Sequence, residues 1–349
     1  MASLCAPENH SPVADAELMR QAVQGWGSDE KTIVNIIGRR NAVQRKLIRG
    51  AYEEIYQEDL VKRLESELSG DFEKAVYRWI LDPADRNAVL ANVAVTQSAT
   101  DYRVIVELSC THSSQELLAV KRAYQARYKH SLEEHLAAHT SGDLRKACNC
   151  TVRNIFYPHF LMTIEERLTF LKALFLLQLL VALVGIYRYD GNEIDAHLAN
   201  SEANVLHNAI EEKVLNHDEI IRIVSTRSKA QLMATFNCYK DDYGTSITKH
   251  LVDDPPNQYL AAIRTAIRCI NDPKKYYAKI LRNALNKPVI EEDTLTRVIV
   301  TRAEKDLEDI NELFYKRNSV SLDHAVSKDT RGNYKAFLLT LLGKEDLLM

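Results

Sequence analysis

The sequence contains few glycines and prolines, 11 and 8 in 349 residues. Sandwiches, barrels and parallel α/β folds use more of both residues in their turns, so this shortage favours helices. The chain also lacks an excess of positive charge, because 45 basic residues stand against 48 acidic ones and the net charge is −3. This balance argues against a dedicated nucleic-acid-binding protein, which usually carries a basic excess.

Cysteine is scarce as well, with six residues at irregular spacing. Such spacing does not form a disulfide framework and fits free thiols in a reducing compartment. Residues 1–20 contain no apolar segment of the kind found in a secretory signal. The hydrophobic content of 46% can fill a large core, which excludes a disordered chain. The composition therefore predicts a soluble, intracellular and mostly helical protein.

One pattern of aromatic, aliphatic and glycine positions occurs four times, in stretches that start at residues 32, 104, 219 and 294. Twenty residues after each start there is an aromatic side chain, in order Tyr52, Tyr124, Tyr239 and Phe314. Forty residues after each start there is an aromatic residue or leucine, in order Phe72, Leu144, Tyr259 and Tyr334. Five or more columns keep this register, which indicates true internal repeats.

The apolar residues inside each copy recur at helical spacing. In the first copy, the helical periodicity is interrupted at residues 38–41, 57–59 and 69–71. Each repeat is therefore expected to contain about five short helices. One such repeat cannot bury its apolar faces alone, so the four must pack together.

Three tetrapeptides mark the last of these breaks: LSGD at residue 68, TSGD at 140 and TRGN at 330. With the four helical repeats, they make the chain resemble the annexin family. The strings GWGSDE at residue 25 and YRYDG at 187 are similar to those of plant annexins. The resemblance implies an all-α fold of four repeats packed as a curved disc. We expect the repeats at residues 13–82, 85–188, 200–271 and 275–346.

The annexin resemblance also implies a function. It predicts a non-enzymatic protein that binds anionic phospholipid membranes peripherally in the presence of Ca²⁺, in the cytoplasm, at the plasma membrane or at endomembranes. No nucleic-acid partner is expected.

The first repeat contains a candidate calcium loop, Gly25-Trp26-Gly27-Ser28. Two glycines allow a tight turn whose carbonyl oxygens point outward, and calcium takes six to eight oxygen ligands. The resemblance implies ligation by the carbonyls of Gln24 or Trp26, Gly25 and Gly27 and by the Glu67 carboxylate. The alternative is an ordinary turn between helices with an exposed glutamate. Trp26 suits a membrane interface, although it could equally fold back onto its helix pair.

The other three repeats depart from this loop pattern. The second has Gln97 to Thr100 in place of the glycines, and His139 at the acidic position. The third lacks the glycine pair but keeps Asp254, and the fourth keeps Asp329 beside a loop that contains Pro288. We expect one intact calcium site, with weak sites at most at Asp254 and Asp329.

Other functions remain open as alternatives. The main alternative is an interaction scaffold that binds actin or another protein and whose calcium sites are largely degenerate. Residues 221–223 (Ile-Arg-Ile) resemble a suggested actin-binding motif, but an ordinary apolar helix face is the favoured interpretation of them. Residues 241–244 match DxxG, a weak nucleotide motif, and no phosphate-binding loop accompanies them. Cys110 and Cys238 could form a redox pair or be buried thiols. Arg39, Arg40, Arg45 and Lys46, or Lys274 and Lys275, could contact a membrane or be a solvated face.

One block, residues 147–178, does not fit the repeat. Without it the second repeat would pass directly into an apolar helix that we expect to begin at Leu179. The uncharged run from Ala173 to Tyr187 is shorter than the roughly 20 residues that a membrane-spanning helix needs. The block is either an insert adhering to a core helix or a segment not selected as structure, such as an unspliced one. We expect a chain without it to stay equally helical and to become more soluble.

Overall fold

The computed structural model describes residues 1–24, 27–97, 101–139, 164–211, 217–251 and 257–344, with the backbone only at 164–170 and 217. Within these ranges all regular structure is helical and no strand occurs. The chain divides into two compact units. The terminal unit contains residues 1–86 and 274–349, and the central unit contains residues 87–273.

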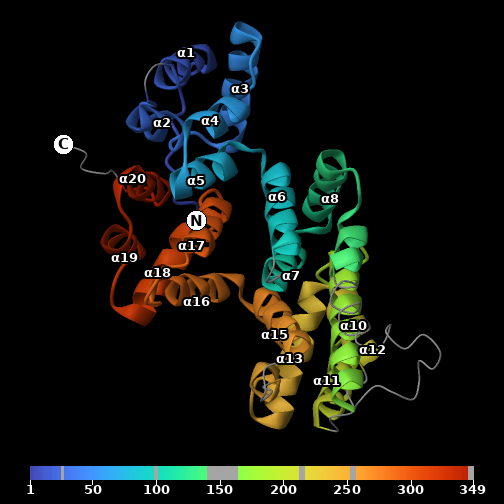
Figure 1. The fold of residues 1–349 in the computed structure, drawn as a ribbon. Coiled ribbons are helices and arrows are strands. Elements are labelled where there is room, and N and C mark those ends of the chain that lie inside the picture. The colour runs from blue at the N-terminus through green and yellow to red at the C-terminus, as the bar shows by residue number, and fades with distance from the viewer. Residues whose placement is uncertain (25–26, 98–100, 140–163, 212–216, 252–256, 345–349) are drawn as a thin grey trace. The chain divides into compact units, whose positions relative to one another are not determined.

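In its described residues, the terminal unit contains five helices of the first repeat and five of the fourth (Figure 1). Those of the first repeat are α1 (Pro12–Ala22), α2 (Glu30–Ile37), α3 (Ala42–Tyr56), α4 (Leu60–Glu67) and α5 (Gly70–Ile80). Those of the fourth are α16 (Pro273–Leu285), α17 (Glu292–Arg302), α18 (Leu307–Asn318), α19 (Leu322–Asp329) and α20 (Gly332–Leu341). The breaks expected at residues 38–41 and 57–59 are confirmed, and the third lies at residues 68–69, one residue before the expected 69–71.

Local sequence explains where these helices begin. Asn41 and Gln44 form a capping box at the start of α3, in which each side chain accepts a hydrogen bond from the other residue's backbone N–H. The repeated glycine at the start of α5 and of α20 has a positive φ, +70° at Gly70 and +59° at Gly332. This is the left-handed region that favours glycine, which explains the glycine column of the repeat.

The core of the terminal unit joins its two repeats. Helix α5 packs on α17 and α20, and α2 packs on α20. Trp79 on α5 is fully buried, and its indole N–H donates to the carbonyl of Ile37 at 2.8 Å. The guanidinium of Arg45 lies 3.7 Å from the centre of the Trp79 ring. Arg45 is thus part of the core, where burial lowers its pKa.

The central unit contains the second and third repeats (Figure 1). The second provides α6 (Pro83–Thr96), α7 (Tyr102–Thr111), α8 (Ser114–Tyr128), a helix over residues 132–139 and α10 (Ile164–Val184). The third provides α11 (Ala196–Glu211), α12 (His217–Thr226), α13 (Lys229–Tyr243), α14 (Ile247–His250) and α15 (Gln258–Asn271). Helix α7 packs on α15, and α10 packs on α7, α12 and α15.

Helix α10 differs from the expected start at Leu179. It begins at Ile164, so residues 164–178 of the inserted block continue the helix toward its N-terminus. The prediction was wrong because the apolar pattern upstream extends the helix without a break. Leu176 from the block is 3% exposed, and the Phe175 ring lies 6.1 Å from that of Tyr259. The end of the block therefore contributes to the core, while residues 147–163 lie outside the described residues.

The inserted helix also preserves the register of the repeat. Leu176 precedes Leu179 by three residues, as Phe72 precedes Ala75 in the first repeat. Phe72, Ala75, Leu176 and Leu179 are all buried. Leu176 thus stands at the register position that the sequence pattern gave to Leu144. No helix within the described ranges combines the length and the apolar character needed to cross a bilayer.

Candidate functional site

The loop between α1 and α2 is closed by its own backbone. The N–H of Asp29 donates to the carbonyl of Ala22 at 2.8 Å. The Asp29 carboxylate caps α2 by accepting from the backbone N–H and the hydroxyl of Thr32, at 3.1 and 2.7 Å. These hydrogen bonds to Thr32 lower the pKa of Asp29. The loop is therefore held at both ends, where helix α1 stops and α2 starts.

Gly27 gives this loop a conformation that other residues rarely adopt. Its φ is +100°, and no atom lies within 4 Å of the position that a Cβ would occupy. The described part of the loop thus agrees with the expected need for glycine at this position. Gly25 and Trp26 lie outside the described residues, so their carbonyl ligands and the Trp26 membrane contact stay predictions. Gln24 is described, and its side-chain amide lies beside the Arg20 guanidinium.

Glu67 is the last residue of α4, and an arginine joins it to the loop. The Arg63 guanidinium is 3.0 Å from the Glu67 carboxylate and donates to the carbonyl of Val23 at 2.9 Å. Because Val23 follows the last residue of α1, the C-terminal ends of α1 and α4 lie close together. Both ends carry negative partial charge, which favours a cation between them. We identified Glu67 from the family pattern but missed Arg63, although its i,i+4 spacing to Glu67 is a visible signal.

The fourth repeat keeps the loop closure without the glycines. The N–H of Glu291 donates to the carbonyl of Ala284 at 3.2 Å, as Asp29 does to Ala22. The Lys287 ammonium contacts the Glu291 carboxylate, and Val289 is 81% exposed. Asp329 ends α19 as Glu67 ends α4. The acidic position is therefore preserved beside a loop of different chemistry, and a weak site at Asp329 stays a prediction.

The corresponding positions of the second and third repeats are only partly described. Asp254 and the loop residues 98–100 and 212–216 lie outside the described residues, so a weak site at Asp254 stays a prediction. His139 is exposed and its Nδ1 is 3.2 Å from the carbonyl oxygen of His135.

The first of the two basic clusters considered as a membrane contact, residues 39–46, is wrong for two of its four members. Arg40 forms a bidentate ion pair with Asp15, with both N–O distances 2.8 Å. Arg45 is 1% exposed and binds the Glu304 carboxylate at 3.0 Å. Both guanidinium groups hold the terminal unit together, so neither can project toward a bilayer.

The structure gives residues 221–223 a packing role. Ile223 is fully buried and Ile221 is 9% exposed, both on α12, while Arg222 binds Glu219 at 2.7 Å. The apolar helix face that we considered is confirmed for the two isoleucines. Arg222 is 41% exposed, and actin binding stays a prediction.

The DxxG motif and Cys110 offer little chemistry, and Cys110 and Cys238 are both free thiols. Asp241 and Asp242 are exposed in the last turn of α13, which Gly244 caps with a φ of +68°. The C-terminal end of a helix disfavours a phosphate. Cys110 is fully buried, and burial raises the pKa of its thiol, which keeps the sulfur protonated and unreactive.

Comparison with known proteins identifies the family. The family model "Annexin" matches residues 14–79, 87–149, 201–259 and 276–341. The chain belongs to the annexin family. It is 61% identical over 346 residues to annexin-like protein RJ4 of Fragaria ananassa, covering 99% of this chain and 100% of the relative. This identity to a plant protein makes the chain a plant-type annexin.

Solved annexin structures share the fold. A structure of annexin III has a TM-score of 0.83 at 28% identity and covers 99% of this chain and 98% of its own. A calcium-bound annexin (Sm)1 has a TM-score of 0.76 at 25% identity and covers 99% and 93% of the two chains. The all-α prediction is confirmed, and annexins are known for calcium-dependent binding to phospholipid membranes. The family matches leave residues 150–200 uncovered, which includes most of the block that did not fit the repeat.

Proposed function

We propose that this annexin binds anionic phospholipid membranes peripherally through calcium held at the α1–α2 loop. The proposed ligands are the backbone carbonyls of Gln24 or Trp26, Gly25 and Gly27 and the carboxylate of Glu67. Water and a lipid phosphate oxygen complete the oxygen shell that calcium prefers. A calcium ion bound there contacts the loop and the lipid phosphate at the same time and so links the protein to the membrane.

One observation carries the proposal: a cation already lies between the end of α1, where the loop begins, and the proposed ligand Glu67. The Arg63 guanidinium contacts the Val23 carbonyl on one side and the Glu67 carboxylate on the other, at 2.9 and 3.0 Å. Two helix ends and a carboxylate converge there, so the site attracts positive charge. Calcium must compete with Arg63 for Glu67.

The donor set fits calcium rather than a softer metal. Backbone carbonyls and one carboxylate are hard oxygen ligands, which calcium prefers. Gly27 has a φ of +100° and no side chain, so no side chain crowds this part of the loop. The Glu67 side chain is 23% exposed and lies next to the solvent-facing loop, so an ion and a lipid phosphate can reach it.

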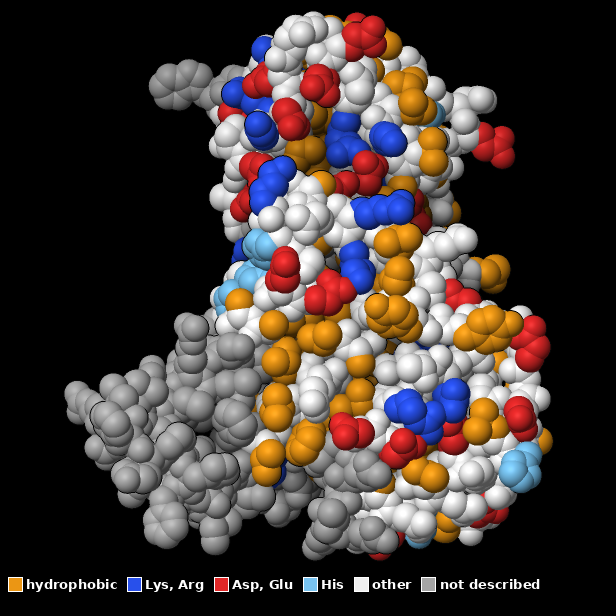
Figure 2. Space-filling model, turned by 90° about the vertical axis from the view of Figure 1, so that its right-hand side faces the viewer, with side chains coloured by type: hydrophobic (Ala, Val, Ile, Leu, Met, Phe, Trp, Pro, Cys, Tyr) orange, Lys and Arg blue, Asp and Glu red, His pale blue; other side chains and the backbone are white. Residues whose placement is uncertain are grey.

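Charge distribution explains why calcium is needed. The net charge is −3. On the face displayed in Figure 2, the basic and acidic side chains drawn in colour intermingle and form no field of one sign. Such a surface has little bulk attraction to an anionic membrane, so a divalent ion can supply the attraction. With one intact loop, the avidity is expected to be lower than for an annexin with several.

Sedimentation with phosphatidylserine vesicles tests the proposal. The wild type should pellet with vesicles when calcium is present and stay in the supernatant when it is chelated. Glu67→Gln should lose calcium-dependent pelleting because it removes the single charged ligand. Glu54→Gln, which removes an exposed carboxylate from α3, should behave as the wild type does.

Two results would contradict the proposal. Pelleting that does not depend on calcium would indicate charge-driven or scaffold binding instead. Calcium-dependent pelleting that survives Glu67→Gln would place the functional site in another repeat, and Asp329→Asn would then be the next variant.

A further inference from the structure

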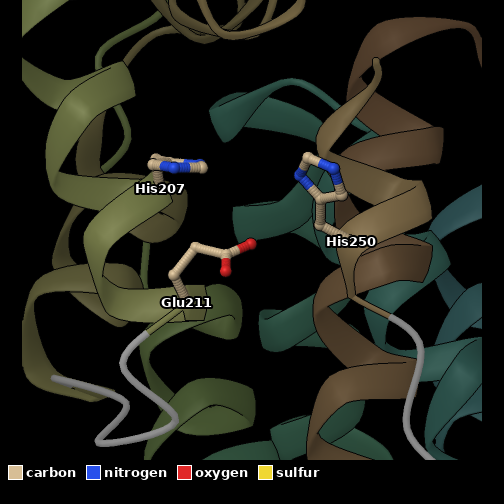
Figure 3. A group of neighbouring side chains, drawn as sticks. All are labelled: His207, Glu211 and His250. Carbon is tan, nitrogen blue, oxygen red and sulfur yellow. The ribbon is translucent and has the colours of Figure 1, made fainter. Parts of the chain in front are cut away.

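A second group of metal-ligating side chains lies in the third repeat, away from the α1–α2 loop. His207 and Glu211 project from α11 one helical turn apart, and His250 ends α14 (Figure 3). One ligand atom from each of the three residues lies within 4.8 Å of the other two. Figure 3 shows the three side chains directed toward one another across the space between the helices.

A buried tyrosine orients both imidazole rings. The Tyr239 hydroxyl is 2.6 Å from Nδ1 of His250 and 3.4 Å from Nδ1 of His207. A hydroxyl oxygen has two lone pairs and can accept an N–H from each ring. In that arrangement the Nε2 lone pair of each histidine stays available, as it is in metal-ligating histidines whose second nitrogen is hydrogen-bonded.

The surroundings hold this geometry in place. Tyr239 is fully buried, so its hydroxyl has little freedom to move away from the two imidazole rings. The Tyr243 ring stacks on His207 with 3.6 Å between ring centres and an angle of 10°. The Tyr243 hydroxyl donates in turn to Asn204 at 2.5 Å. Glu211 is exposed, so its side chain can rotate toward an ion.

The first and third repeats carry different side chains at these three positions. The equivalent residues of the first repeat are Arg20, Gln24 and Arg63. There the tyrosine hydroxyl accepts from Arg20 at 3.1 Å, and Arg63 binds Glu67. The first repeat thus fills the place with fixed positive charge. The third repeat has histidines in place of both arginines and Glu211 in place of the glutamine. These three side chains can ligate a cation, whereas the two arginines of the first repeat carry the positive charge themselves.

The ligand chemistry indicates the class of ion. Two imidazoles and one carboxylate suit zinc and its transition-metal neighbours, whereas calcium takes oxygen ligands almost exclusively. Tetrahedral zinc keeps nitrogen and oxygen ligands about 3.4 Å apart. The three ligand atoms, which lie within 4.8 Å of one another, must therefore approach by up to about 1.4 Å, through rotation of the exposed Glu211 side chain and of the histidine side chains. Three protein ligands leave a fourth position for water.

We propose that His207, Glu211 and His250 form a site for a divalent transition-metal ion of the zinc class, which fastens α11 to α14. The site is independent of the calcium loop of the first repeat and of lipid. The ion stabilises the third repeat at the ends of the two helices that lead into residues 212–216 and 252–256.

Zinc alone, added to the chelator-treated full-length protein, is the probe. Competition with a chromophoric chelator should reveal one tight site per chain, and Zn²⁺ should raise the melting temperature, while an equal concentration of Ca²⁺ should not compete. His250→Asn and Glu211→Gln should each weaken zinc binding about tenfold or more. His197→Asn, which changes an exposed histidine on α11, should leave zinc affinity unchanged.

Cobalt provides a readout that does not depend on any variant folding. Co²⁺ bound to the wild type should give the intense visible absorption of a tetrahedral site, and Zn²⁺ should abolish it at one equivalent. A wild type with no stoichiometric zinc site, or a site that survives both His250→Asn and Glu211→Gln, would overturn the proposal. A purely octahedral cobalt spectrum would also overturn it, because it would indicate loose binding to surface histidines.

Discussion

Arg63 and Glu67 lie one turn apart on α4 and form a 3.0 Å ion pair at the place where the proposed calcium ion needs the glutamate. Arg63 also donates to the Val23 carbonyl at 2.9 Å, so it ties α4 to the end of α1. In the proposed calcium site, the Arg63 guanidinium would compete with the calcium ion for the Glu67 carboxylate.

Removing the competing cation should strengthen calcium binding. A partly exposed ion pair contributes about 0.5–1 kcal/mol. Arg63→Ala should therefore lower the calcium concentration for half-maximal vesicle binding about two- to fivefold. Calcium titration in the sedimentation assay measures this shift. Lys62→Ala is the matched control, since it removes an exposed positive charge from the same helix and should not lower the calcium requirement. A higher requirement in Arg63→Ala would mean that the arginine mainly organises the loop.

His135 should make the folded protein sensitive to mild acid. Burial, with help from the neighbouring charges of His139 and His130, lowers its pKa from 6.5 to about 4. Between these values the unfolded chain binds a proton that the folded chain does not. The free energy of unfolding should therefore fall as the pH is lowered from 6.5 to 4, with no loss from this group above pH 6.5.

The measurement is denaturant unfolding of the calcium-free protein at pH 7 and at pH 5. His135→Gln should reduce the difference in stability between the two pH values, because glutamine does not titrate. His324→Gln, an exposed histidine on α19, should leave that difference unchanged. An equal pH dependence in the wild type and in His135→Gln would show that other groups cause the acid sensitivity.

The last turns of the inserted block should contribute to stability. Leu176 is 3% exposed, so Leu176→Ala should lower the free energy of unfolding by about 2–4 kcal/mol. Leu171→Ala, at a position 42% exposed on the same helix, should cost less than about 0.5 kcal/mol. Thermal melting followed by circular dichroism compares the two. Equal melting temperatures for the two variants would show that the inserted segment adds nothing to the core.

Deletion of residues 147–178 should nevertheless leave a folded protein. It would place Leu144 three residues before Leu179, the register that Leu176 has now. The deleted chain is expected to keep its helical content per residue and its cooperative melting. Loss of both would show that the block is an obligatory part of the second repeat.

Sequence periodicity predicted the helices well because helix formation and capping are local. The breaks at residues 38–41 and 57–59 were readable from spacing and from residues such as Asn41, which caps α3. The start of α10 was not, because the inserted residues continue an apolar pattern that no breaker interrupts. A local pattern cannot reveal whether a long helix arose from one segment or from two.

The sequence by itself determined that the protein is an all-helical chain of four repeats and that only the first repeat has the glycine loop and Glu67. The tertiary structure decided which charged or ligating side chains lie together beside the first-repeat loop and at the corresponding part of the third repeat. Arg63 and Val23 are 40 residues apart, and His207 and His250 are 43 apart. Neither pair belongs to a local motif. In the first and third repeats, long-range packing brings the end of the first helix close to the fourth helix. The side chains there give the first repeat a guanidinium and the third repeat two imidazoles.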